Sequence, residues 1–178
     1  MIPFIVVTLD MENPNPEVEF DETPDVLENL TLDDLKRMDT ELEDKVTGDE
    51  IFSLVCDIKD PEHPDLSLAQ LRVVRRKDIH IGDNGNIVLE YTPTIPTCSV
   101  AVLIGLTLLR KLELCVSRTM HKVHVRIADG KHVQEKQVNK QLADKERVAA
   151  AMENPNLSKL VREGVYKTDV IPNHLLLW

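Results

Sequence analysis

The chain changes from strand to helix at Tyr91-Thr-Pro-Thr-Ile-Pro-Thr-Cys-Ser-Val-Ala-Val-Leu-Ile-Gly105. Pro93 and Pro96 fix their own φ and disfavour helix in the residues before them, so the chain should stay extended until about Thr97. Thr97 can cap a helix that continues through the apolar segment after it, over about residues 98–112. This stretch therefore predicts that Cys98 lies in the first turn of a buried helix.

A cysteine at a helix start lies in the positive field of the helix dipole and near free backbone amides. Both favour the thiolate over the thiol, and the thiolate is the form that attacks electrophiles and binds metals. Free cysteine is also among the most buried residue types and often only fills space in a core. The local sequence of Cys98 leaves both roles open.

Length and composition indicate one globular domain with an appendage. The chain has 178 residues, of which 42% are hydrophobic and 3% aromatic, and its net charge is −10. An acidic chain with so few aromatic side chains has neither the positive surface nor the stacking platforms that nucleic acids require. We therefore expect a core of Val, Leu and Ile and no nucleic-acid partner.

The acidic charge is concentrated at the beginning of the chain. Residues 1–50 contain 16 of the 31 acidic side chains but only three basic ones. Together with repeated Asn-Pro pairs, this predicts a solvated, largely disordered arm over residues 1–47, with one short amphipathic helix near residues 31–38. We expect a folded domain over residues 48–164 and a tail over residues 165–178.

The three cysteines, Cys56, Cys98 and Cys115, are too few and too widely spaced for a zinc site or a disulfide framework. A reducing compartment is the natural interpretation. We found no apolar run of the length that a membrane-spanning helix needs, and the first residues make a poor signal peptide. The sequence thus predicts a soluble intracellular protein without a membrane partner.

Periodicity elsewhere predicts an α+β fold with the element order α-β-β-α-β followed by C-terminal helices. We expect a small, mainly antiparallel sheet, made of a hairpin and one further strand and covered by helices on one face. The expected elements are a helix capped by Asp49, strands 73–81 and 86–91 joined by a type I′ turn at Asn84-Gly85, a strand at 123–127, and helices that begin near residue 133, after Asp144 and at Asn156 and end by Gly164.

The loop Asp60-Pro-Glu-His-Pro64 places two carboxylates and an imidazole between two prolines. Asp60, Glu62 and His63 include the donor types of a metal site, but they suit a solvated turn equally well, and we favour the turn. His121 and His124 also look like a chelating pair. Side chains three positions apart on a strand face opposite sides, so we interpret these two as surface residues.

Four segments carry a closer resemblance: Asp60-Pro-Glu-His-Pro64, residues 91–99, Leu103-Ile-Gly-Leu106, and Asn139-Lys-Gln-Leu-Ala-Asp-Lys-Glu-Arg-Val-Ala-Ala-Ala-Met-Glu-Asn-Pro-Asn-Leu157. Together they closely resemble the cytosolic iron–sulfur assembly component 2 family over about residues 48–164. The sequence leans to the B form of that family at His63-Pro64 and His124-Val-Arg-Ile127. At Ala151-Met-Glu-Asn-Pro-Asn156 it is more similar to the A form.

The resemblance implies a non-catalytic targeting factor in the cytoplasm and nucleus. Such a factor works with a WD40 propeller protein and a HEAT-repeat adaptor to deliver [4Fe–4S] clusters to apoproteins. Cys98 falls on the reactive cysteine of the family, and Asp60 and Glu62 fall on an acidic loop that lies near it. Thr97, followed by Cys98 and Ser99, stands where family members commonly carry histidine, so a role assigned to that histidine does not transfer here.

A [4Fe–4S] cluster normally needs four thiolates, and this chain has three separated cysteines. We therefore expect no stably bound cofactor, and a transient cluster for which Cys98 is one ligand while partners or a second copy of the chain supply the others. Two alternatives remain open: a cysteine-nucleophile enzyme with His63 as its base, and an adaptor in which Cys98 is structural. The end of the sequence, Leu176-Leu177-Trp178, only partly matches the tails of the family's clients, and we favour a sticky or partner-packed end.

Overall fold

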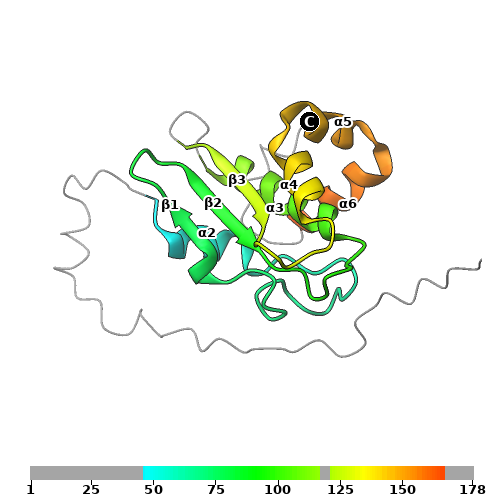
Figure 1. Ribbon diagram of the computed structural model, residues 1–178, viewed down its shortest axis with the longest axis horizontal. Helices are drawn as coiled ribbons and strands as arrows, with labels where there is room; N and C mark the ends of the chain where they lie inside the picture. The colour runs from blue at the N-terminus through cyan, green and yellow to red at the C-terminus, as the bar shows by residue number, and fades with distance from the viewer. Residues whose placement is uncertain (1–45, 117–120, 167–178) are drawn as a thin grey trace, which may run out of the picture.

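The computed structural model describes residues 46–116 and 121–166, and it has the α+β architecture that the sequence predicted (Figure 1). The expected helix at residues 31–38 and the end at Leu176–Trp178 lie outside the described residues. The described elements, in order, are α2 (Gly48–Val55), the 3₁₀ turn η2 (Arg76–Asp78), β1 (Ile79–Ile81), β2 (Ile87–Tyr91), α3 (Ala101–Cys115), β3 (Val123–Ile127), α4 (Glu135–Ala143), α5 (Lys145–Glu153) and α6 (Pro155–Tyr166).

The three strands form one mixed sheet in the order β1-β2-β3. β1 pairs with β2 antiparallel, with Ile79 opposite Leu89, whereas β2 pairs with β3 in parallel, with Leu89 opposite Val125. The prediction of a mainly antiparallel sheet is therefore wrong for the second pairing. The cause is α3, which carries the chain from the end of β2 back to the level where β2 began, so that β3 runs in the same direction.

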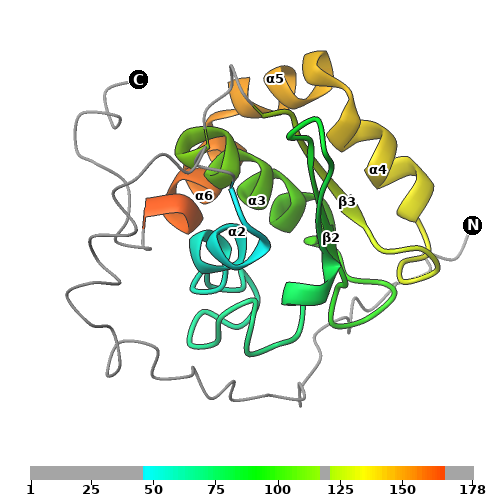
Figure 2. The same ribbon diagram turned by 90° about the vertical axis from the view of Figure 1, so that its left-hand side faces the viewer.

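The sheet is covered on one face, as predicted. Figure 2 shows α2, α3 and α6 on the same side of the strands. The strand side chains buried against them are Ile79, Ile87, Leu89, Tyr91, Val125 and Ile127. On the opposite face, Arg126 is exposed and forms an ion pair with Glu90, because neighbouring side chains of a strand point to opposite faces.

The α4 helix closes the free edge of β3. Ala128 N–H donates to Tyr91 O, which leaves the N–H and C=O of Ile127 facing away from β2. The side-chain amide of Asn139 satisfies both groups: its Oδ1 accepts from Ile127 N at 2.7 Å, and its Nδ2 donates to Ile127 O at 3.1 Å. Asn139 thus blocks the strand edge to further pairing.

The α3 helix forms the centre of the core, and close approach to it depends on two glycines. A Cβ on Gly105 would lie 2.5 Å from Leu142 Cδ1 and 2.7 Å from Tyr91 Oη. A Cβ on Gly164 of α6 would lie 2.8 Å from Thr107 Cγ2. Gly164 is therefore a packing residue, and the prediction that it ends the last helix is wrong because α6 continues to Tyr166.

Two predicted helix caps differ from those observed. Thr47, not Asp49, caps α2 through a capping box with Glu50. Asn154, not Asn156, accepts hydrogen bonds from the first amides of α6. The predicted cap at Asp144 is confirmed, since its side chain accepts from the N–H groups of Glu146 and Arg147.

The hairpin between β1 and β2 is confirmed, but its turn is not type I′. That type needs positive φ at both central residues. Gly85 has a φ of 75°, whereas Asn84 lies outside the positive range. The chain instead closes a turn in which Gly85 N–H donates to Gly82 O at 2.8 Å, and the Gly at the end of this turn supplies the one left-handed residue that the reversal needs.

Candidate functional site

Cys98 lies in the turn between β2 and α3 (residues 95–100, the cysteine turn) and precedes the helix. Its N–H donates to Ile95 O at 3.2 Å, and α3 begins only at Ala101. Val100 occupies the cap position and makes no side-chain cap bond, while Thr97 is exposed. The prediction that Thr97 caps the helix and that Cys98 lies in its first turn is therefore wrong, because the chain forms one more turn before the helix starts.

The structure places Glu62 directly against the cysteine turn. Cys98 Sγ lies 3.9 Å from Glu62 Oε2, and Ser99 Oγ donates to Glu62 Oε1 at 3.3 Å. The two oxygens of one carboxylate thus contact two consecutive residues of the turn. Cys98 itself is buried, with 4% of its surface exposed.

Asp60 shapes the loop that carries Glu62 (residues 60–64, the acidic loop). Its Oδ1 accepts hydrogen bonds from the backbone amides of Glu62 at 2.8 Å and His63 at 2.9 Å. Asp60 is 3% exposed, so the expectation of a solvated turn is wrong for this residue. Within residues 46–116 and 121–166, no three His, Cys, Asp or Glu side chains gather as a metal site.

Burial, with smaller contributions from the carboxylates of Glu62 and Asp60, raises the pKa of the Cys98 thiol to about 11. A hydrogen bond from the Val100 backbone amide acts in the opposite direction and is outweighed. The helix-start argument favoured a thiolate, whereas the raised pKa favours a neutral thiol at physiological pH. The reason is that desolvation and negative neighbours oppose the charge that one amide favours.

Comparison with known proteins identifies the family. The chain is 44% identical over 157 residues to the MIP18 family protein galla-2 of Drosophila melanogaster, covering 88% of this chain and 96% of the relative. It is 43% identical over 169 residues to a MIP18 family protein of Schizosaccharomyces pombe, covering 85% and 93%. The chain belongs to the MIP18 family.

A mammalian member connects the MIP18 family with the resemblance read from the sequence motifs. Cytosolic iron-sulfur assembly component 2B of Mus musculus is 46% identical over 126 residues, covering 70% of this chain and 76% of the relative. No protein-family model matches the chain. The curated relatives thus carry the assignment, and they confirm the resemblance to this group of assembly components.

Sequence reasoning missed two side chains of this MIP18 family site. Tyr91 Oη donates to Ala101 O at 2.7 Å and so fixes the first residue of α3. Burial raises the pKa of Tyr91, and the nearby Cys98 adds to the effect. His132, from the loop after β3, lies with its Nε2 at 3.1 Å from Cys98 O. Tyr91 stands in the motif already recognised, whereas no local pattern links His132 to Cys98, 34 positions earlier in the chain.

The sequence left His63 open as a catalytic base for Cys98, and the described hydrogen bonds do not join its imidazole to the sulfur. Its Nε2 is buried and has no hydrogen-bond partner among the residues that the structure describes. The hydrogen-bond acceptor found beside the Cys98 sulfur is the carboxylate of Glu62. A histidine–cysteine pair of the kind that activates a thiol nucleophile is therefore not formed by His63 in the described fold.

The other two cysteines lie elsewhere in the MIP18 family fold. Cys115 is the last residue of α3, about 20 Å from the start of that helix at 1.5 Å per residue. Cys56 follows the end of α2, where its Sγ contacts Ser53 O at 3.6 Å. Among the described residues, the three cysteines therefore do not form a complete four-thiolate site.

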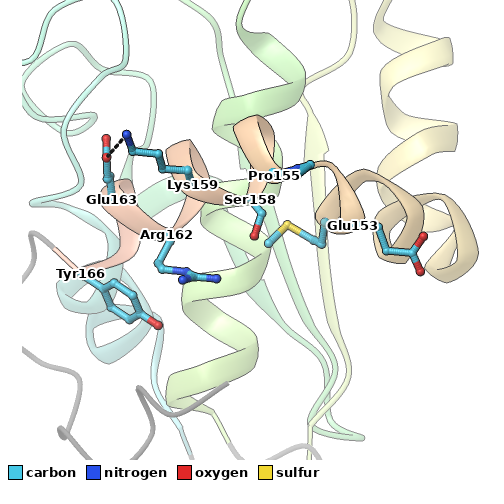
Figure 3. Close-up of a pocket in the computed structure, with 8 residues that line it drawn as sticks. Glu153, Pro155, Ser158, Lys159, Arg162, Glu163 and Tyr166 are labelled. Carbon is cyan, nitrogen blue, oxygen red and sulfur yellow. Dashed lines mark ion pairs between the residues drawn. The ribbon is translucent and has the colours of Figure 1, made fainter.

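Two hollows flank the C-terminal helices. A cleft of about 140 Å³ separates part of the acidic loop, at Pro61 and Pro64, from α3 and α6, so this loop is incompletely packed. A groove of about 620 Å³ follows α5 and α6, where Lys159 and Glu163 form an ion pair of 3.9 Å (Figure 3). None of the site residues lines this groove. No helix in the described parts of the chain is long and apolar enough to cross a membrane.

Proposed function

We propose that this protein is a non-catalytic component of cytosolic iron–sulfur assembly that helps to deliver [4Fe–4S] clusters to apoproteins of the cytoplasm and nucleus. It does so together with a WD40 propeller protein and a HEAT-repeat adaptor. Membership of the MIP18 family, which includes the mouse cytosolic iron-sulfur assembly component 2B, supports this role. The observation that carries the chemistry is the contact of 3.9 Å between Cys98 Sγ and the Glu62 carboxylate.

The cluster is cargo in this proposal, and Cys98 is one of its transient ligands. A thiol must lose its proton to bind iron. Glu62 Oε2 is the nearest acceptor, so the S–H bond breaks, an S–Fe bond forms, and the proton passes to the carboxylate. The remaining ligands come from partner proteins or a second copy of the chain, because Cys115 lies at the other end of α3.

Burial of Cys98 limits when the thiol can bind a cluster. With a pKa of about 11, the thiol stays protonated and unreactive in the closed cysteine turn. Binding therefore requires that the turn or the acidic loop moves, and the incompletely packed loop at Pro61 and Pro64 is the segment that can yield. A ligand that is exposed only on demand suits transfer better than storage.

The second candidate is an adaptor in which Cys98 is structural, and the 4% exposure of this residue favours it. A cysteine-nucleophile enzyme is less well supported. Such an enzyme lowers the pKa of its thiol, whereas the pKa of Cys98 is raised. The histidine that does contact Cys98 bonds to its carbonyl oxygen and not to its sulfur.

Co-purification tests the proposal. Tagged wild type, Cys98→Ala and the matched control Cys56→Ala are expressed with the propeller and HEAT-repeat partners and isolated without oxygen. We expect all three to retain both partners and only Cys98→Ala to lose iron and sulfide from the complex. Failure of wild type to bind the partners would refute the proposed function, and equal iron in all three complexes would favour the adaptor.

A further inference from the structure

The loop between β3 and α4 (residues 128–134, the strap loop) lies against the cysteine turn. Val133 N–H donates to Pro96 O at 2.9 Å, and His132 Nε2 lies 3.1 Å from Cys98 O. One loop therefore holds two backbone carbonyls that are two residues apart. The strap loop and the acidic loop approach Cys98 through different atoms, the first through its carbonyl oxygen and the second through its sulfur.

The hydrogen bonds of His132 define its tautomer. Gln134 N–H donates to His132 Nδ1 at 3.1 Å, so Nδ1 presents a lone pair. In the neutral ring the hydrogen must then be on Nε2, which donates it to Cys98 O. Imidazole is well suited to this position because it accepts on one side and donates on the other.

Hydrogen bonds within the strap loop hold His132 in place independently of its contact with Cys98. Gly130 takes a φ of 72° and its N–H donates to the Glu135 carboxylate. Lys131 N–H donates to Ala128 O at 3.2 Å, and Glu135 N–H donates to His132 O at 3.2 Å. These bonds tie the loop to the end of β3 and the start of α4, so it can support the cysteine turn.

We propose that His132 is a positioning residue that keeps the cysteine turn closed and Cys98 Sγ buried against Glu62. The inference rests on the proposed function, because it names the side chain that controls exposure of the cluster ligand. Breaking the bond between His132 and Cys98 O frees the turn to open, and the thiol then reaches solvent or an incoming cluster. His132 acts on Cys98 through the backbone and does not touch the sulfur.

Two substitutions separate the two hydrogen bonds of His132. In His132→Asn, the side-chain oxygen can still accept from Gln134 N–H as in an Asx turn, but the side chain is too short to reach Cys98 O. In His132→Gln, the longer amide can still donate to Cys98 O. Both variants keep a neutral polar side chain, so a difference between them reports on the contact with Cys98.

The readout is the rate of iodoacetamide alkylation of each cysteine at pH 8, measured by peptide mass spectrometry on the full-length protein without cluster. Loss of one ordinary hydrogen bond should raise the open population, and hence the Cys98 rate, about fivefold in His132→Asn. His132→Gln should stay within about twofold of wild type. Cys56 and Cys115 should react at wild-type rates in both variants.

Equal Cys98 rates in wild type and His132→Asn would overturn the inference, as would equal rates in the Asn and Gln variants. A parallel rise at Cys56 and Cys115 would also overturn it, because it indicates general loosening. The ring ¹⁵N spectrum of wild type provides a check that does not depend on variant folding. It should show Nε2 protonated and Nδ1 bare in His132 at pH 8, and the opposite tautomer would contradict the proposed bond. Neither measurement involves an iron–sulfur cluster or a partner protein. A failure of this inference can therefore be distinguished from a failure of the proposed function in the co-purification experiment.

Discussion

Replacing Glu62 by Gln should make Cys98 more acidic. The amide has nearly the same shape as the carboxylate and retains an oxygen that can accept from the thiol, but it removes one negative charge from a position 3.9 Å from Sγ. That charge opposes formation of the thiolate and is among the causes of the raised Cys98 pKa. The substitution therefore isolates the electrostatic part of the environment that keeps Cys98 neutral.

The size of the effect follows from the distance. Two unit charges 3.9 Å apart interact by about 1 kcal/mol in bulk water and by about 4 kcal/mol at an effective dielectric constant of ~20. The pKa of Cys98 rises in total from 9.0 to about 11, and burial is the largest cause, so the share of Glu62 lies near the lower figure. A contribution of about 1 kcal/mol means that Glu62→Gln should lower the pKa of Cys98 and raise its thiolate fraction at pH 8 about fivefold.

The assay is alkylation of Cys98 by iodoacetamide from pH 7.5 to 11, with Cys56 and Cys115 in the same molecule as references. Ser99→Ala is the matched control, because it removes the 3.3 Å hydrogen bond to Glu62 and leaves the charge in place. Its Cys98 should titrate near 11, as in wild type. A Cys98 pKa that stays at about 11 or rises in Glu62→Gln would refute the electrostatic reasoning.

Three further predictions concern stability. Folding raises the pKa of Cys98 from 9.0 to about 11, so the contribution of the neutral thiol to folding stability is complete below pH 9 and is lost as the pH rises to 11. In Cys98→Ala, the loss of unfolding free energy between pH 9 and pH 11 should be smaller than in wild type by roughly 2 kcal/mol, as measured by urea unfolding at both pH values. The same loss of stability in wild type and Cys98→Ala would contradict this prediction. Gly105→Ala should cost about 1–3 kcal/mol by overpacking against Leu142, whereas Gly48→Ala, with nothing within 4 Å, should be nearly neutral; equal melting temperatures would contradict this. Asn139→Ala should lower the free energy of unfolding by about 1–3 kcal/mol and speed hydrogen exchange of the Ile127 amide. Unchanged exchange at Ile127 would contradict the proposal that Asn139 blocks the edge of β3.

Local patterns predicted the elements of this fold well because each depends on neighbouring residues. The alternation of Val123, Val125 and Ile127 gave β3, and Asp144 gave the start of α5. Thr47 and Glu50 have the spacing of a capping box, and this reciprocal pair caps α2 in place of Asp49. The parallel pairing of β2 with β3 was harder to predict from local patterns, because the direction of β3 depends on where the α3 helix returns the chain.

The sequence predicted the candidate site only in part, because several of its contacts form only in the tertiary fold. The family resemblance placed the loop of Asp60 and Glu62 near Cys98, and the structure has Glu62 Oε2 3.9 Å from Cys98 Sγ. The protonation state was wrong because burial and the carboxylates of a loop 36 positions away decide the pKa, and the helix starts later than predicted. His132 was missed for the same physical reason, since only the tertiary fold brings the strap loop to the cysteine turn.

Cluster transfer tests the central claim most directly. The complex with its propeller and HEAT-repeat partners is reconstituted anaerobically with a [4Fe–4S] cluster, mixed with an apo-client, and followed by recovery of client activity. Wild type and Cys115→Ala should transfer at similar rates, because Cys115 lies at the far end of α3. Cys98→Ala should transfer little or none, and undiminished transfer by Cys98→Ala would contradict the role of this thiol as the cluster ligand.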